Sequence, residues 1–413
     1  MNNFQPTLST KNVPRPAAPH FVRQGRSVPF SVYALATILY LHNDSCFVCG
    51  KWQEIGNNAV FFWYKLFILQ NTEESIDTPT PSILLFNFNI FNEEEIQMEL
   101  EKFNAPFKGR SLLTWIDYTP EEILKFLEIA ENVKAQAKNN ETHLRFLGKT
   151  IALIFEKRST RTRCSFETAF GEEGGHPVFL STQDIQLGGK ETIEDTARVL
   201  GRMFSAIEFR GFSQKHVEIL SKYSGIPVIN GLTDEFHPTQ ALADILTLKE
   251  TFGTLKGLKL VYCGDGRNNV ARSTMIICSK LGIDFGIFSP KELFPDQEII
   301  DICKPFAEKS GAKIEISDDI SIVKGANAVY TDVWISMGEE ALKDERTKLL
   351  APYQVNQNLM DKTENPDAIF LHCLPAVKGE EVTADVIEGK QSKVWDQAEN
   401  RKHTIKAIML ALI

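Results

Sequence analysis

An alternation of short apolar segments with amphipathic segments constrains the fold of this chain more than any other feature. Apolar runs of strand length, such as Thr150–Phe155 and Leu258–Cys263, alternate with segments of helical spacing, such as 237–252 and 268–281. Strands that are connected through helices pair in parallel and carry helices on both faces of the sheet. The 413 residues suffice for two such cores. The sequence therefore predicts an α/β fold with two doubly wound parallel-sheet domains joined by helices.

Charge and hydrophobicity exclude two classes of partner. The net charge of −9 argues against a nucleic-acid partner, because binding to a phosphate backbone needs a basic surface. No run reaches the roughly 18 apolar residues that a membrane span needs. We therefore expect neither a nucleic-acid nor a membrane partner, although a local basic pocket for one small anion remains compatible with this charge.

The seven cysteines are scattered and odd in number. A disulfide framework is not expected in a chain of this size, so a reducing compartment, the cytoplasm, is favoured. Cys46 and Cys49 form a Cys-x-x-Cys pair, but without a second such pair zinc or redox chemistry is only a weak alternative.

The first 97 residues differ from the rest and are predicted to be an N-terminal extension of uncertain structure. Four basic residues and no acidic residue precede Asp44. Such a basic start is typical of a mitochondrial transit segment, which would place the mature protein in the matrix. The alternative is a disordered extension. Met98 is the next methionine after Met1, and we hypothesise that translation begins there.

A Ser-Thr-Arg-Thr-Arg segment at 159–163 follows the apolar run Thr150–Phe155 and opens a predicted helix. Hydroxyls, free backbone N–H groups and the positive end of a helix would meet a guanidinium there, which favours a phosphate site. The alternative is a capped helix with two solvated arginines.

Four further sites carry polar residues where predicted strands end or helices begin. Arg210 ends a short strand, His237 and Gln240 share one face at a helix start, and Asp332 and Cys373 each end a strand. In open α/β sheets, ligands bind beyond the carboxyl ends of the strands. Taken singly, each has a structural alternative: a surface arginine, a capping or packing histidine, a capping aspartate or a buried cysteine.

Three local predictions concern the chain around these sites. Thr119 begins a capping box, which predicts a helix start. Pro375 is expected to keep Leu374 extended and so to direct nearby carbonyl groups into a pocket. The segment 399–401 is expected to open the closing helix.

Together these motifs resemble the aspartate/ornithine carbamoyltransferase family, from about Phe107 to the C-terminus. The motifs that carry the resemblance are Phe-Glu-Lys-Arg-Ser-Thr-Arg-Thr-Arg (155–163), Asp-Thr-Ala-Arg-Val-Leu (195–200), Phe-His-Pro-Thr-Gln (236–240), Asp332 with Ser-Met-Gly (336–338), His-Cys-Leu-Pro (372–375) and Ala-Glu-Asn-Arg (398–401). Arg272 and Trp395 depart from the usual family pattern, and we expect neither to touch a motif residue.

The resemblance implies the transfer of a carbamoyl group from carbamoyl phosphate to the side-chain amine of L-ornithine, a reaction of arginine metabolism that gives citrulline and phosphate. It implies no metal and no cofactor, and trimers as the basic assembly. It also implies a carbamoyl phosphate-binding domain at 98–247, an ornithine-binding domain at 248–395, and a C-terminal helix at 396–413 that packs back on the first domain.

The site residues follow from the same resemblance. Carbamoyl phosphate would be bound by Ser159, Thr160, Arg161, Thr162, Gln186, Arg210, His237, Gln240, Cys373, Leu374 and Arg401. Ornithine would be bound by Asn269, Asp332, Ser336 and Met337. The catalytic set would be Arg161, Arg210, His237 and Cys373. A putrescine carbamoyltransferase and a catalytically inactive paralogue remain as alternatives.

Overall fold

The computed structural model describes residues 46–55, 58–67, 93–181, 185, 190–335 and 340–413. The chain divides into two units, Met1–Asn92 and Glu93–Ile413. In the first unit, β1 (Cys46–Ile55) and β2 (Asn58–Phe67) form an antiparallel hairpin. The Cys46–Cys49 pair lies on β1, outside the residues whose side chains are described.

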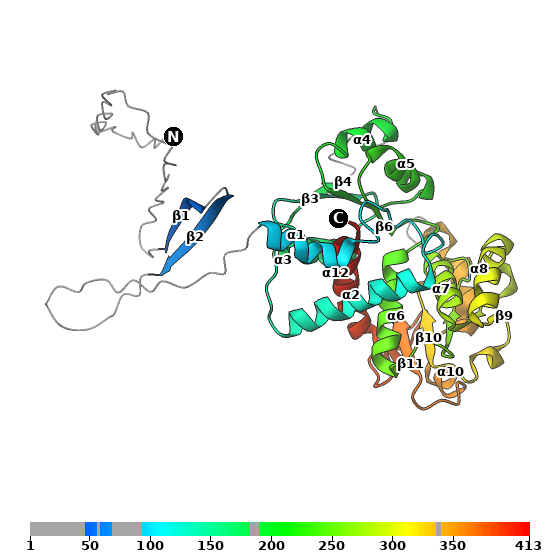
Figure 1. The fold of residues 1–413 in the computed structure, drawn as a ribbon. Helices are drawn as coiled ribbons and strands as arrows, with labels where there is room; N and C mark the ends of the chain where they lie inside the picture. Colours follow the sequence, from blue (N-terminus) through cyan, green and yellow to red (C-terminus); the bar gives the residue numbers. More distant parts are fainter. Residues whose placement is uncertain (1–45, 56–57, 68–92, 182–184, 186–189, 336–339) are drawn as a thin grey trace, which may run out of the picture. The chain divides into compact units, whose positions relative to one another are not determined.

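A four-stranded parallel sheet forms the core of the N-terminal half of the second unit (Figure 1). Its order is β4-β3-β5-β6, and its strands are β3 (Thr150–Phe155), β4 (His176–Ser181), β5 (Ala206–Arg210) and β6 (Val228–Leu232). The helices between the strands are α3 (Thr160–Glu172), α4 (Ile193–Leu200) and α5 (Gln214–Ser224).

A five-stranded parallel sheet forms the core of the C-terminal half. Its order is β11-β10-β7-β8-β9, with β7 (Lys259–Cys263), β8 (Asp284–Phe288), β9 (Ile314–Ser317), β10 (Ala328–Thr331) and β11 (Ile369–His372). Its helices are α7 (Asn269–Leu281), α8 (Gln297–Ser310), α9 (Lys343–Leu350), α10 (Gln357–Asp361) and α11 (Ala384–Ile387). The predicted fold class, two parallel-sheet α/β domains, is confirmed.

Four further helices flank or join the two sheets: α1 (Glu93–Asn104), α2 (Pro120–Lys138), α6 (Pro238–Phe252) and α12 (Val394–Leu412). The predicted capping box is present, because the Thr119 hydroxyl accepts from Glu122 N and the Glu122 carboxylate accepts from Thr119 N. Helix α12 packs against α2, α3 and α6, while α6 also packs against α7. These helices therefore connect the two halves through one apolar core.

The closing helix begins earlier than the sequence predicts. Helix α12 starts at Val394, whereas the start was expected at 396 or at the 399–401 segment. Val394 is fully buried, and this apolar contact extends the helix by one turn at its N-terminal end.

Helix α1 spans the predicted boundary at residue 97, and Met98 lies inside it with an exposed side chain. A chain that started at Met98 would lack the first residues of this helix. The expected domain boundaries stay predictions. Among the described residues, no helix is long and apolar enough to cross a membrane.

Candidate active site

The start of α3 has the arrangement that the phosphate motif predicts. The Ser159 side chain caps the helix and accepts a hydrogen bond from Thr162 N at 3.2 Å. Thr160, the first helical residue, is exposed, and Arg161 is half-buried. The alternative of a solvated arginine applies only to Arg163, which pairs with Glu167 on the outer face of the helix.

The Thr162 hydroxyl is the point where two buried arginines from distant segments meet. Arg210, at the end of β5, donates to Thr162 Oγ1 at 3.4 Å, and Arg401 of α12 donates to it at 3.2 Å. Arg401 also donates to Gln240 Oε1 at 2.5 Å and to Thr239 Oγ1 at 3.2 Å. We call Arg161, Thr162, Arg210, His237 and Arg401 the cationic pocket.

The positive charge of the cationic pocket has little compensation. Burial lowers the pKa of Arg210 to about 10, and burial together with Arg210 lowers the pKa of Arg401 to about 10. Both guanidinium groups stay charged at neutral pH. Glu208 is a nearby acid whose pKa is raised well above its usual value by burial, although Arg210 and Arg401 lower it. The arrangement therefore favours a bound anion.

His237 precedes the first residue of α6 and is almost completely buried. Its Nε2 lies 3.4 Å from Arg401 Nη1. Burial lowers the pKa of His237 well below its usual value, and Arg401, Arg210 and Arg161 lower it further. The imidazole is therefore neutral, and its contribution is hydrogen bonding rather than charge.

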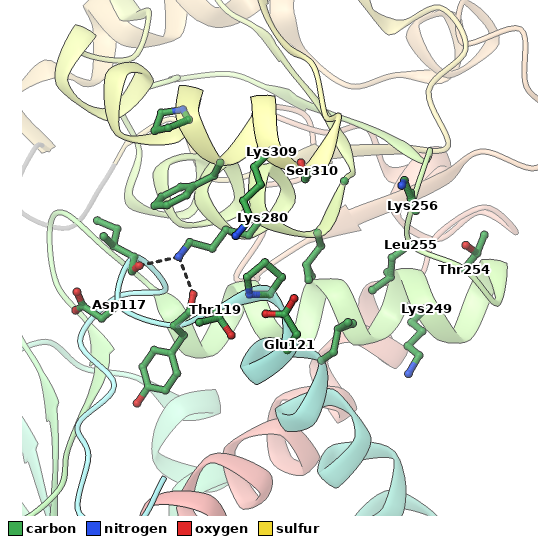
Figure 2. A pocket seen from close by; sticks show the side chains of 18 residues that line it. Asp117, Thr119, Glu121, Lys249, Thr254, Leu255, Lys256, Lys280, Lys309 and Ser310 are labelled. Atoms are coloured by element: carbon green, nitrogen blue, oxygen red, sulfur yellow. Dashed lines mark hydrogen bonds between the residues drawn. The ribbon is translucent and has the colours of Figure 1, made fainter. Parts of the chain in front are cut away.

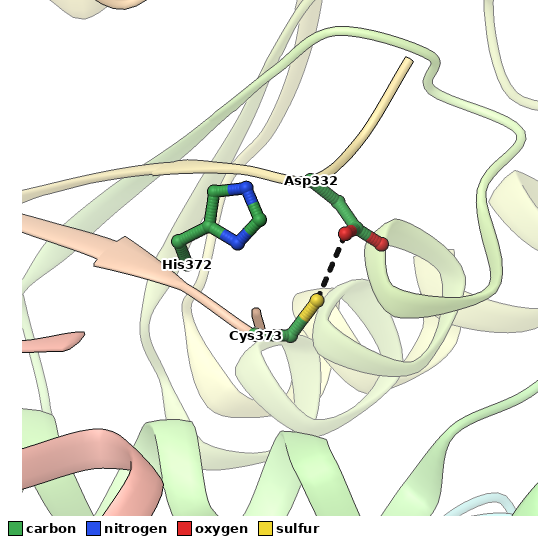
Figure 3. A group of neighbouring side chains, drawn as sticks. All are labelled: Asp332, His372 and Cys373. Carbon is green, nitrogen blue, oxygen red and sulfur yellow. Dashed lines mark hydrogen bonds between the residues drawn. The ribbon is translucent and has the colours of Figure 1, made fainter. Parts of the chain in front are cut away.

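Asp332 and Cys373 follow the neighbouring strands β10 and β11 and face each other (Figure 3). Cys373 Sγ donates to Asp332 Oδ1 at 2.9 Å, and Asn268 donates to Asp332 Oδ2 at 3.3 Å. Burial raises the pKa of the Cys373 thiol well above its usual value, and Asp332 raises it further. The thiol is therefore protonated. We call Asp332 and Cys373 the acceptor pair.

Asp332, His372 and Cys373 lie close enough together to suggest a metal centre, with potential ligand atoms within 4.8 Å of one another. The histidine does not fit this interpretation. His372 Nδ1 accepts from Leu374 N at 2.8 Å, and Nε2 lies 3.1 Å from Glu381 Oε1, so the ring proton is on Nε2. Neither ring nitrogen has a free lone pair for a metal, and two ligands alone do not form a tetrahedral site.

The expected extended conformation of Leu374 is wrong. Leu374 has φ +57°, in the left-handed region, and precedes a cis peptide bond to Pro375. The backbone N–H of Leu374 donates to His372 Nδ1, and this hydrogen bond orients the imidazole. Leu374 nevertheless lies next to the acceptor pair, as its place in the motif implies.

Asp244 belongs to this site but was missed. It lies four residues after Gln240 on α6 and is fully buried, and its Oδ1 accepts from Gln240 Nε2 at 2.8 Å and from Gln397 Nε2 at 2.6 Å. Gln397 in turn accepts from His372 N at 2.9 Å. Burial raises the pKa of Asp244 to about 7 despite these hydrogen bonds. The four-residue spacing on one helix face was the signal that could have found it.

Asn269 is the first residue of α7, and its side chain donates to Thr233 O at 2.6 Å. The expectation that Arg272 touches no motif residue is wrong, because its guanidinium lies 5.3 Å from the ring of Phe236, next to His237. Three predicted site residues lie outside the described residues: Gln186, Ser336 and Met337.

The fold and the site together define a two-domain α/β protein with a buried cationic pocket beside an acidic pair at the carboxyl ends of parallel strands. Sequence profiles of the aspartate/ornithine carbamoyltransferase carbamoyl-P binding domain and Asp/Orn binding domain match residues 110–250 and 256–412. The chain belongs to the aspartate/ornithine carbamoyltransferase family. The family predicted from the motifs is confirmed.

Relatives with known names match this chain over most of its length. It is 66% identical over 307 residues to an ornithine carbamoyltransferase of Caldanaerobacter subterraneus subsp. tengcongensis, covering 74% of this chain and 98% of the relative. It is 53% identical over 328 residues to a catabolic ornithine carbamoyltransferase of Streptococcus gordonii, covering 75% and 97%. The solved ornithine carbamoyltransferase from Pyrococcus furiosus is 50% identical with a TM-score of 0.72, covering 74% and 97%.

Proposed function

We propose that the chain transfers the carbamoyl group of carbamoyl phosphate to the side-chain amine of L-ornithine, which gives L-citrulline and phosphate. One observation carries the proposal: the cationic pocket lies beside the acceptor pair. Burial lowers the pKa of both Arg161 and Arg210, and Asp332 raises it, so the two groups of residues interact electrostatically. A phosphorylated donor and an aminated acceptor can therefore be held side by side.

In this proposal the cationic pocket binds carbamoyl phosphate. The start of α3 supplies the Ser159 and Thr160 hydroxyls and backbone N–H groups to the phosphate, where the helix dipole also favours an anion. Arg161, Arg210 and Arg401 add guanidinium groups. Gln186, His237, Gln240, Cys373 and Leu374 complete the proposed donor site.

The acceptor pair binds ornithine in this proposal. The δ-amine must be neutral to attack, so the ammonium that remains for Asp332 is the α-ammonium. Asn269, Ser336 and Met337 complete the proposed acceptor site. Aspartate as acceptor would require cations at this position, whereas the described pair is a carboxylate and a neutral thiol.

The proposed reaction starts when the neutral amine attacks the carbamoyl carbon. Arg161, Arg210 and His237 stabilise the tetrahedral oxyanion, and the bond to phosphate then breaks. The amine must lose a proton, yet Cys373 is protonated and His237 is a weak base. The departing phosphate therefore takes the proton, and Cys373 positions the amine rather than deprotonating it.

Assembly and location are part of the proposal. We place the protein in the cytoplasm as a homotrimer, or a multiple of trimers, on the basis of the family resemblance and the scattered cysteines. The same site serves the synthesis and the phosphorolysis of citrulline, so the concentrations of the substrates determine the direction of flux.

The test is a stoichiometric assay of the full-length chain with carbamoyl phosphate and ornithine. The proposal predicts citrulline and inorganic phosphate in equal amounts. Phosphate release without citrulline would contradict it, and an absence of both products would support the alternative of an inactive paralogue.

A further inference from the structure

A second pocket of about 910 Å³ lies at the C-terminal ends of α6, α7 and α8 and contains none of the residues of the candidate active site (Figure 2). Helix α6 begins after His237, and α7 begins at Asn269, so each of these helices has one end near the active site and the other at this pocket. Thr254, Leu255 and Lys256, in the connection between the two family segments, line its wall. We call it the hinge pocket.

The walls of the hinge pocket come from both halves of the enzyme. The segment from Ile116 to Leu124 belongs to the carbamoyl-P binding segment, whereas Lys280–Gly282 and Pro305–Ser310 belong to the Asp/Orn binding segment. The volume lies within the range of small-molecule sites, roughly 300–1,000 Å³. An occupant would therefore contact both halves at once.

Apolar side chains form the floor of the pocket. Leu255 is buried, while Leu281 and Phe306 are half-buried. Leu124 of α2 is 44% exposed, a high fraction for a leucine in a helix. Together these side chains give the pocket an apolar lining that the apolar part of a ligand can contact.

The rim carries more positive than negative side chains: four lysines, 249, 256, 280 and 309, against Asp117 and Glu121. Lys280 is 6% exposed and donates to the backbone carbonyls of Ile116 at 2.7 Å and Tyr118 at 2.6 Å. Its Nζ also lies 4.0 Å from the centre of the Phe306 ring, and burial lowers its pKa although Asp117 and Glu122 raise it. Lys280 therefore contributes a buried charge, whereas Lys309 is exposed and can contact a ligand.

Lys280 and Lys309 lie together at one end of the pocket, while Lys249 and Lys256 lie at the other (Figure 2). Lys249 pairs with Glu131 at 2.8 Å. Within the described part of the chain, Lys256, Lys280 and Lys309 form no ion pair. The Lys280–Lys309 end is thus a cationic site next to an apolar floor.

We propose that the hinge pocket binds an amphipathic organic anion, with the anionic group at Lys309, beside the buried charge of Lys280, and an aromatic or branched aliphatic body on Leu124 and Leu255. Because the walls belong to both halves, a bound anion links the halves on the side away from the candidate active site. The site is therefore distinct from the one that binds the substrates.

Two fluorescent probes with the same ring system test the charge requirement. 8-Anilino-1-naphthalenesulfonate carries an anion, and N-phenyl-1-naphthylamine is its neutral counterpart. Both are titrated into the full-length chain with saturating inorganic phosphate, which occupies the cationic pocket. We expect saturable binding of the sulfonate, weakened about 10-fold by Lys309→Glu, while binding of the neutral amine changes less than about 2-fold. Leu124→Gln is expected to weaken binding of both probes.

Lys222→Glu, a charge reversal on α5, is the matched control and should leave the binding of both probes unchanged. The proposal is wrong if the sulfonate does not saturate, if Lys309→Glu and Lys222→Glu have equal effects, or if phosphate displaces the dye. A change of molecular mass in the Leu124 or Lys309 variants would also overturn it, because the pocket would then be a contact between copies. None of these readouts depends on catalysis, so citrulline formation can fail while dye binding holds.

Discussion

The cationic pocket and the acceptor pair hold their charges in different ways. In the cationic pocket, Arg161, Arg210 and Arg401 come together, and burial and mutual repulsion lower the pKa of Arg210 and Arg401 although nearby acids raise it. The carboxylate of Asp332, by contrast, accepts hydrogen bonds from the Cys373 thiol and the Asn268 amide. The cationic pocket needs an anion to offset the like charges that are buried there. At the acceptor pair, a ligand only has to replace one hydrogen-bond donor of Asp332 with another. Ligands should therefore affect the two regions to different extents.

The largest effect is expected in the cationic pocket. Arg161→Ala removes a guanidinium that we propose to bind the phosphate and offset the oxyanion, so kcat/KM for citrulline formation should fall about 10³-fold or more. The matched control is Arg163→Ala, because Arg163 lies on the outer face of the same helix. Steady-state kinetics check both variants. Equal losses of kcat/KM in the two would show that Arg161 contributes no more to the reaction than Arg163 does.

A smaller effect is expected at the acceptor pair. Asp332→Asn keeps the shape but removes the charge that pairs with the α-ammonium, so KM for ornithine should rise about 30- to 100-fold, roughly 2–3 kcal/mol. KM for carbamoyl phosphate should change little. Asp367→Asn, an exposed turn residue, is the control. An increase confined to the KM for carbamoyl phosphate would show that Asp332 serves the donor instead.

The pH dependence of stability should change at Asp244. Its pKa is about 7 in the folded state and 3.8 ordinarily, so the folded state binds the extra proton between these values. Its stabilising contribution is complete below pH 3.8 and is lost as the pH rises through 7. Asp244→Asn does not titrate, so it should gain about 2 kcal/mol relative to the unchanged protein between pH 5 and pH 7. Urea unfolding at both values measures this, and a constant difference would contradict the assignment.

The smallest effect is expected at Cys373. Because its thiol is protonated and donates one hydrogen bond, Cys373→Ala should lower kcat/KM about 5- to 10-fold. The pH profile of kcat should keep its shape. A loss of kcat/KM comparable to that of Arg161→Ala, or a changed pH profile of kcat, would indicate that the thiol accepts a proton during the reaction.

Local patterns in the sequence predicted those parts of the fold that local interactions determine. The apolar run Thr150–Phe155 is β3, residue for residue, and the capping box at Thr119 starts α2. These succeeded because strand burial and helix capping depend on neighbouring residues. The start of α12 was predicted too late, because burial of Val394 depends on a distant sheet.

The parts of the site that sequence reasoning missed depend on contacts between distant segments. The spacing between Gln240 and Asp244 is local, but the second hydrogen bond to Asp244 comes from Gln397, more than a hundred residues away. The left-handed conformation of Leu374 is accompanied by a hydrogen bond from its backbone N–H to the side chain of His372, which no local sequence pattern predicts. Motif recognition identified the residues of the cationic pocket, but their charge states required the burial that only the fold provides.

The ratio of kcat/KM for ornithine to kcat/KM for putrescine tests the central claim most directly, because putrescine keeps both nitrogen atoms of ornithine and lacks only the α-carboxylate. With the full-length chain and saturating carbamoyl phosphate, the ratio should exceed about 100, since losing one charge pair alone costs roughly 2–3 kcal/mol. Asp332→Asn should lower kcat/KM for both amines, because both carry a second ammonium that can pair with this carboxylate. Faster turnover of putrescine than of ornithine would contradict the proposed acceptor.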